Sequence, residues 1–128
     1  MIIQIKKTDV FIPDIEDNLE QPPSEQIKFH FRYASTEERK RYMHVKPMKF
    51  RTSKEINDSD MEVEYVQDGE GLAKATVTGI ENLSVQNGDG APKDIKTIAE
   101  FYKQPMSKMA TQLETHLLNA NAVVETKN

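Results

Sequence analysis

A glycine-rich turn at 87–90, Asn-Gly-Asp-Gly, is the stretch of this 128-residue chain that comes closest to an ion-binding or phosphate-binding loop. A calcium loop needs oxygen ligands at alternate positions and a closing bidentate carboxylate, and neither register supplies them. A phosphate loop needs Gly-Lys-Ser/Thr after the turn, but Gly90 is followed by Ala-Pro-Lys. We therefore interpret 87–90, and the Asp-Gly-Glu-Gly stretch at 68–71, as tight turns in which glycine supplies a positive φ.

The remaining reactive side chains do not form a recognisable catalytic or metal-binding pattern. His30, His44 and His116 are too scattered to place two ligands on one helix face, and the chain has no cysteine. The carboxylates are interleaved with polar residues, which is the wrong environment for raising one pKa against another. No serine lies in a nucleophile elbow. We therefore predict no metal, no cofactor and no enzymatic activity.

Basic and aromatic residues alternate over 27–33, the strongest period-two pattern in the chain. Aromatic rings beside cations are how proteins hold single-stranded nucleic acids. In a strand, however, alternation puts the rings of Phe29, Phe31 and Tyr33 on the face opposite Lys28 and Arg32. Core packing explains these rings better, so we expect no nucleic-acid partner.

Charge is segregated in the middle of the chain although the net charge is only -4. Residues 28–54 contain nine Lys and Arg against two Glu, and residues 55–70 contain seven acidic residues and no Lys or Arg. The two blocks can neutralise each other across a hairpin or helix contact, or each can face an oppositely charged partner. Internal compensation with a solvated surface is the default interpretation.

Length and composition predict one domain over 1–120 and a flexible tail over 121–128. The apolar start of the chain has its lysines after rather than before it, unlike a signal peptide. No apolar stretch approaches the about 20 residues that cross a bilayer. We expect a soluble, cytoplasmic protein, because the lack of cysteine also fits a reducing compartment.

The first half of the chain predicts strands separated by a loop and one short helix. Alternation at 3–5 and an apolar run at 10–12 predict one or two short strands, closed by Pro13. A loop follows at 14–24, and then the strand at 27–33. Ser35 and Glu38 form a capping box that starts a helix at about 36–42. The segment 45–50 is typical of an edge strand, the position that tolerates a proline.

The second half is ambiguous at first and then helical. Residues 61–78 fit either strand or helix, and a hairpin through 68–71 competes with a helix over 72–77. Helical spacing predicts one helix from 95 to about 103, after start signals at Pro92 and Asp94, and another from Pro105 to Ala120. Together the elements predict an α+β fold: a small antiparallel N-terminal sheet with a short helix, followed by a C-terminal helical region.

The apolar stripe of the last helix has two interpretations. It is ordinary core, which is the default, or it is an adaptable groove for an apolar partner helix, since methionine is a flexible contact residue. The stripe is formed by Met106, Met109, Ala110, Leu113, Leu117 and Ala120.

The order of these segments resembles the tail assembly chaperones of long-tailed bacteriophages. The strand at 27–33 followed by Ser-Thr-Glu-Glu-Arg at 35–39 is similar to that family's strand and helix start. The segment 77–83, Val-Thr-Gly-Ile-Glu-Asn-Leu, is similar to its central aliphatic-Gly-aliphatic-acid segment, and 89–92 is similar to its Asp-Gly turn. The chain departs from the pattern in lacking tryptophan, in its acidic linker and in its two glycines at 69 and 71.

The resemblance implies a non-enzymatic role in the host cytoplasm: binding the helical tape-measure protein, shielding its apolar surface, and helping tail tube subunits to polymerise around it. It assigns partner contact to the C-terminal helices, that is, to Ile98, Phe101, Tyr102, Met106, Met109, Leu113 and Leu117. The alternatives are a structural virion component, such as a tail or head-tail joining protein, and a bacterial protein-interaction module. The sequence leaves a homo-oligomer open.

Overall fold

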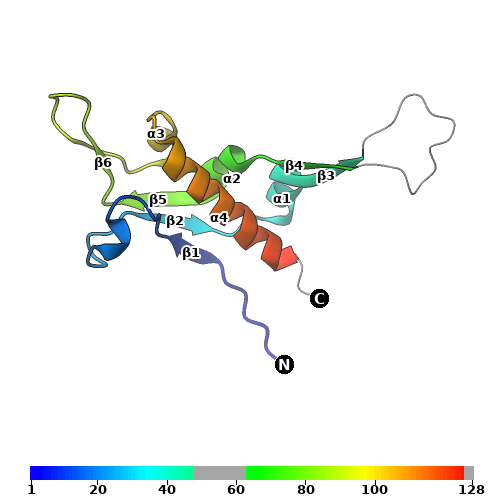
Figure 1. Ribbon diagram of the computed structural model, residues 1–128. Helices are drawn as coiled ribbons and strands as arrows, with labels where there is room; N and C mark the ends of the chain where they lie inside the picture. The colour runs from blue at the N-terminus through cyan, green and yellow to red at the C-terminus, as the bar shows by residue number, and fades with distance from the viewer. Residues whose placement is uncertain (48–62, 126–128) are drawn as a thin grey trace, which may run out of the picture.

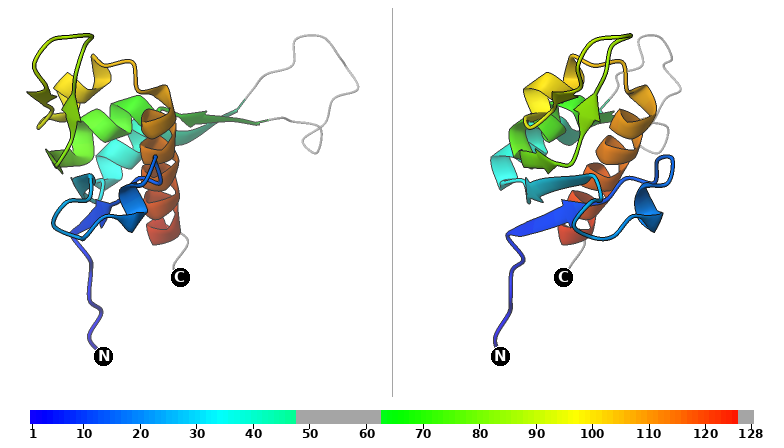
Figure 2. Two further views of the ribbon diagram at one scale, coloured as in Figure 1. Left: turned by 60° about the vertical axis from the view of Figure 1, so that its left-hand side comes forward. Right: turned by 90° about the vertical axis from the view of Figure 1, so that its left-hand side faces the viewer.

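The computed structural model describes residues 1–47 and 63–125, and its centre is a three-stranded antiparallel sheet. The strands β1 (Thr8–Phe11), β2 (Lys28–Arg32) and β5 (Val77–Glu81) lie in the order β1-β2-β5. The long helix α4 (Ser107–Glu125) crosses one face of this sheet, as Figures 1 and 2 show. The predicted α+β fold is confirmed.

The central strand β2 supplies the aromatic core, as its period-two pattern predicts. Phe29 and Phe31 are buried, while their neighbours along the strand are half-buried. The Phe29 ring packs edge-on against Phe101 with 5.1 Å between centroids, and the Phe31 ring meets His116 of α4 at 5.6 Å. The alternation therefore places these rings in the core, under α4.

The predicted strand at 3–5 is wrong, because residues before Thr8 lie outside β1 and leave Ile3 and Ile5 exposed. The Tyr33 N–H donates to the Lys7 carbonyl at 3.0 Å, and beyond Tyr33 the chain turns into a helix. Residues 1–6 consequently have no β2 backbone to pair with. We call residues 1–7 the N-terminal arm.

The loop predicted at 14–24 contains one turn of 3-10 helix, η1 (Asn18–Glu20), which is held by a buried asparagine. The Asn18 amide donates to the Pro13 carbonyl at 2.9 Å, and its Oδ1 accepts from the Ile27 N–H at 2.7 Å. Asn18 thus ties the loop to the entry of β2.

The helix α1 (Thr36–Tyr42) begins with the predicted capping box. The Ser35 hydroxyl accepts from the Glu38 N–H at 3.2 Å, and the Glu38 carboxylate accepts from the Ser35 N–H at 2.9 Å. The same carboxylate accepts two hydrogen bonds of 2.7 Å from the Arg32 guanidinium, which lowers the pKa of Glu38 from 4.5 to about 2. Arg32 thereby joins β2 to α1.

We expect the Glu38→Gln variant to lose about 1 to 2 kcal/mol of stability at pH 7, after allowance for the partly exposed Arg32. Because the folded pKa of Glu38 is depressed, its contribution is complete above about pH 4.5 and is lost as the pH falls toward 2. Urea unfolding at pH 7 and at pH 2 to 3 measures this, with Glu37→Gln, an exposed neighbour, as control. An equal loss at both pH values would contradict the assignment.

Beyond α1, strands β3 (Met43–Pro47) and β4 (Val63–Gln67) form an antiparallel ribbon that projects from the body (Figure 1). The edge strand predicted at 45–50 is found in part, since 48–50 lie outside the described residues. For residues 63–67 the structure resolves the ambiguity between strand and helix in favour of strand. Lys46 stands opposite Glu64 in the backbone register, so the basic and acidic blocks run into neighbouring strands here.

Residues 68–71 start a helix and do not form the predicted turn. The helix α2 (Gly69–Thr76) follows Asp68, whose side chain accepts from the Gly71 N–H at 2.9 Å. A Cβ added at Gly69 would lie 2.7 Å from the Glu114 Cβ of α4. Glycine is therefore required at position 69, where α2 approaches α4. Because glycine has a low helix propensity, the sequence pattern predicted a turn at this place.

The predicted turn at 87–90 is confirmed, with Gly88 at a φ of 57°. It connects the two strands of a hairpin that was not predicted, β6 (Ser84–Val85) and β7 (Lys93–Asp94). The next helix, α3 (Ile98–Tyr102), therefore starts three residues later than predicted. The reason is that the Asp94 carboxylate accepts from the Ser84 hydroxyl at 2.6 Å, while the Thr97 side chain caps α3.

The helix α4 starts at Ser107, two residues after Pro105, and ends at Glu125 and not at the predicted Ala120. Asn121, which the sequence assigns to the tail, is fully buried. Its Oδ1 accepts from the Ala34 N–H, and its Nδ2 donates to the Leu117 carbonyl. The described helix thus continues into the predicted tail, and residues 126–128 lie outside the described part.

Candidate partner-binding site

Four of the seven residues predicted to contact a partner belong to the hydrophobic core. These are Phe101, Met109, Leu113 and Leu117, each at most 5% exposed. Ile98, Tyr102 and Met106 are partly buried at the margin of the same core. A partner could reach the four core side chains only if α4 left the sheet, so the folded chain offers just the marginal three.

The margin around Tyr102 is small and polar. The Tyr102 hydroxyl donates to the Glu114 carboxylate at 2.8 Å, the Lys74 ammonium lies 5.5 Å from the ring centre, and burial raises the pKa of the phenol. The adjoining pocket has a volume of about 290 Å³ and also includes Glu70 and Met106. Tyr102 is bonded to Glu114 and Glu70 to Lys74, which makes the pocket a weak site for an apolar helix.

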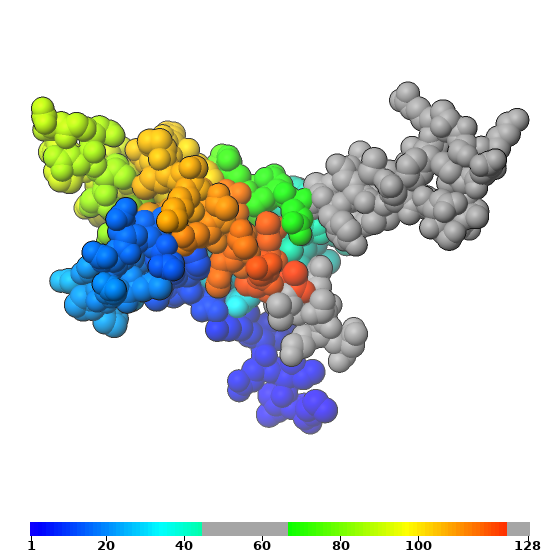
Figure 3. Space-filling view, in the orientation of Figure 1, coloured from blue at the N-terminus to red at the C-terminus, as the bar shows by residue number. Residues whose placement is uncertain are grey.

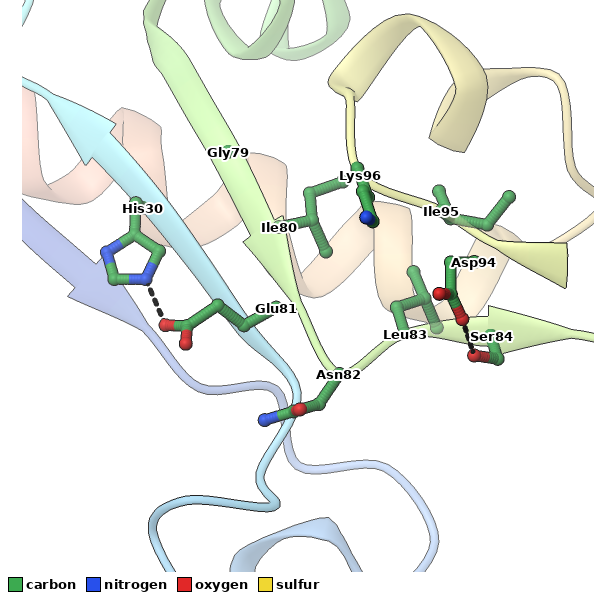
Figure 4. Close-up of a pocket in the computed structure, with 10 residues that line it drawn as sticks. All are labelled: His30, Gly79, Ile80, Glu81, Asn82, Leu83, Ser84, Asp94, Ile95 and Lys96. Carbon is green, nitrogen blue, oxygen red and sulfur yellow. Dashed lines mark hydrogen bonds and ion pairs between the residues drawn. The ribbon is translucent and has the colours of Figure 1, made fainter.

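A second pocket, of about 630 Å³, lies beside β5 and contains the side chains nearest to a catalytic set (Figure 4). His30 is bonded to the Glu81 carboxylate, which lowers the pKa of Glu81, and Ser84 is bonded to Asp94. Figure 4 shows these pairs at opposite ends of the pocket. A nucleophile needs its base within hydrogen-bond reach, and this arrangement does not bring His30 to Ser84.

A larger groove, of about 970 Å³, lies between the N-terminal arm and the end of α4. Its apolar lining consists of Ile3, Ile5, Tyr33, Ala34 and Ala120. Ile3 and Ile5 are each 78% exposed, and Ile2 is 89% exposed. Figure 3 shows the arm standing out from the body of the molecule. Contiguous exposed apolar side chains of this kind mark interaction sites.

The charged residues that line this groove are all cations: Lys6, Lys7, Arg32 and Arg39. Arg39 donates to the Ala34 carbonyl at 3.0 Å and Arg32 is held by Glu38, so both guanidinium groups have fixed positions. Lys6 is paired with Asp9 at 2.8 Å. The groove combines an apolar floor with a basic rim, which suits an apolar segment flanked by acidic residues.

Sequence reasoning missed this groove because it treated the arm as part of the sheet. The available signal was the grouping of three isoleucines and two lysines within seven residues. That composition fits a buried strand as well as an exposed arm. Only the lack of a pairing partner before Lys7 distinguishes the two.

Within the described residues, no cluster of three or more His, Asp or Glu side chains could hold a metal ion, and every buried polar side-chain atom has a partner. No helix in that part of the chain is long and apolar enough to cross a membrane.

Comparisons of the chain with protein-family models, with curated proteins and with solved structures find no match.

Proposed function

We propose that this chain is a non-enzymatic tail assembly chaperone of a long-tailed phage that binds the tape-measure protein in the host cytoplasm and assists tail tube assembly. The observation that carries the proposal is the groove beside the N-terminal arm, where Ile3 and Ile5 lie exposed. A chaperone for a helical client needs an accessible apolar surface, and the chaperone must stay soluble when no client covers that surface. The lysines beside these isoleucines meet that need.

The segments that carry the family resemblance support the proposal because they are neighbours in the fold. The strand at 27–33 and the segment 77–83 supply adjacent strands, with Phe29 opposite Ile80 in the register. The capped helix α1 follows directly from β2, and Arg32 joins the two. The order noted in the sequence is thus also a spatial arrangement around one core.

We assign the client to the groove and not to the stripe of α4. The stripe residues Leu113 and Leu117 are fully buried, whereas Ile3 and Ile5 are open to a partner. The basic rim of the groove, in which Lys6 and Arg32 already have carboxylate partners, favours a client helix with acidic residues beside its apolar face. The tape-measure protein, which is long and helical, is the client that the resemblance implies.

The test is co-expression with a candidate tape-measure protein, measured as the soluble fraction of that protein. We expect the Ile3→Asp/Ile5→Asp variant to lose at least half of the solubilising effect, because it places carboxylates on the apolar floor. Leu19→Asp is the matched control, since Leu19 is also exposed, at 51%, but lies in η1 and outside the groove. Equal loss in both variants, or in neither, would contradict the assignment.

A second measurement separates a chaperone from a structural component. Mass spectrometry of purified particles should not detect the chain, because a chaperone leaves the tail once it is assembled. Its presence at a fixed number of copies per particle would instead identify a tail or head-tail joining protein.

A further inference from the structure

We propose that two copies of this chain form a symmetric dimer by pairing their β1 strands edge to edge, which joins the two sheets into one. The strand β1 is the outermost strand of its sheet. An outermost strand presents backbone N–H and C=O groups that can pair with another chain. This dimer rests on β1 and not on the proposed function, although both use Ile5, so a second copy and the client would compete for that side chain.

The hydrogen-bond phase of β1 identifies which groups point outward. Tyr33 donates to the Lys7 carbonyl, and the register pairs Asp9 with Phe31. In an antiparallel ladder alternate residues bond to the same neighbour, so Lys7 and Asp9 face β2 while Thr8 and Val10 face outward. The outward Val10 N–H now donates to the Asp9 side chain, at 2.8 Å, and pairing would exchange this bond for one to the second copy.

Charge selects one register for a two-fold pair of β1 strands. With Thr8 opposite Thr8, Lys7 of each copy stands opposite Asp9 of the other, which gives two opposite-charge pairs. Shifting the centre to the neighbouring residues puts Lys7 opposite Lys7 or Asp9 opposite Asp9. Like charges directly opposite each other are destabilising.

The same register matches the outward backbone groups and covers exposed apolar surface. Thr8 pairs with itself and Lys6 with Val10; Thr8 and Val10 face outward in β1, and Lys6 joins them if the arm continues the strand on pairing. Ile5 then stands opposite Phe11 of the second copy, on the α4 side, where Phe11 stacks on His116 at 4.6 Å. Pairing would remove Ile5, now 78% exposed, from water.

Lysines often protect sheet edges from pairing, but the two lysines here do not oppose this register. Lys6 stands opposite Val10 of the second copy and so meets no like charge; it gives up its ion pair with Asp9 of its own chain, now at 2.8 Å, because residues three apart in an extended strand lie on opposite faces. Lys7 meets Asp9 of the other copy. The edge therefore accepts a second copy in one register and rejects the neighbouring ones, which is how a specific pair differs from open aggregation.

The first test is sedimentation equilibrium of the full chain with and without Thr8→Pro. Proline removes the outward N–H at the centre of the interface and is tolerated on an edge strand, so the fold should persist. We expect a wild-type dimer and a variant whose dimer dissociation constant is at least tenfold higher, with an unchanged circular dichroism spectrum. A wild-type single copy at all concentrations, or a folded Thr8→Pro variant that dimerises normally, would overturn the dimer.

The second test reads the register directly. Lys7→Asp and Asp9→Lys should each weaken self-association, because each variant places like charges opposite each other at two positions. Mixing the two variants restores opposite charges at both positions, so a heterodimer should form. If the mixture stays as single copies while both variants are folded, the register is wrong.

The two tests fail independently of the chaperone proposal. A wild-type chain that sediments as single copies overturns the dimer, but it leaves the co-expression result for the Ile3→Asp/Ile5→Asp variant unaffected. Leu19→Asp serves as the control in sedimentation as well: it should dimerise like the wild type, because Leu19 lies in η1, outside β1 and the arm.

Discussion

Replacing Leu113 by alanine is expected to lower the free energy of unfolding by about 3 to 5 kcal/mol. The side chain is fully buried in the core under the sheet, and its removal leaves a cavity that the surrounding residues fill only in part. Urea denaturation followed by circular dichroism measures the change, since a 128-residue domain is small enough for two-state analysis.

Met106→Ala provides the matched comparison, because Met106 lies on the same stripe but is only partly buried. We expect it to cost less than about 1.5 kcal/mol. A loss of under 1 kcal/mol for Leu113→Ala would show that the stripe does not hold the fold together, and that the docking interpretation of this face should be reconsidered.

Sequence spacing alone does not assign a role to the apolar stripe of α4. The spacing of Met106, Met109, Leu113 and Leu117 shows that one face of the helix is apolar, but the same spacing fits a core face and a docking face. What decides between them is the tertiary contact with β2 and α2, which the sequence pattern does not contain. The spacing therefore identifies an apolar face, whereas the assignment of partner contact to that face came from the family resemblance and not from the spacing.

Elements whose signals are local were predicted well. The strand around Phe29 and Phe31 follows from strict alternation, and the start of α1 follows from Ser35 and Glu38 three residues apart. Both patterns are complete within fewer than ten residues. No distant contact had to be known for them to succeed.

Elements that depend on distant contacts were predicted poorly. The helix α2 contains two glycines, one of which allows the close approach to Glu114 more than forty residues away. The hairpin of β6 and β7 has only two residues in each strand, too few for a periodic signal. The arm looked like a strand because nothing in its own residues shows that β2 ends before reaching it.

Replacing Asn121 by alanine is expected to cost about 2 to 3 kcal/mol, although the sequence places this residue in a frayed tail. Its Oδ1 accepts from the Ala34 N–H at 2.8 Å, and its amide donates to the Leu117 carbonyl at 2.8 Å. Both Ala34 and Asn121 are buried, so alanine would leave a backbone N–H without a partner and without water. That penalty adds to the small cavity left by the amide.

Asn119→Ala is the matched control, since Asn119 lies two residues earlier in α4 and is exposed. It should change stability by less than about 0.5 kcal/mol. Hydrogen exchange adds a local measurement: in Asn121→Ala, the Ala34 N–H should lose protection beyond what the fall in global stability explains. Equal effects of the two variants would mean that α4 ends before Asn121. A selective effect of Asn121→Ala would instead establish that this asparagine joins the end of α4 to the residue that follows Tyr33, beside the groove to which we assign the partner.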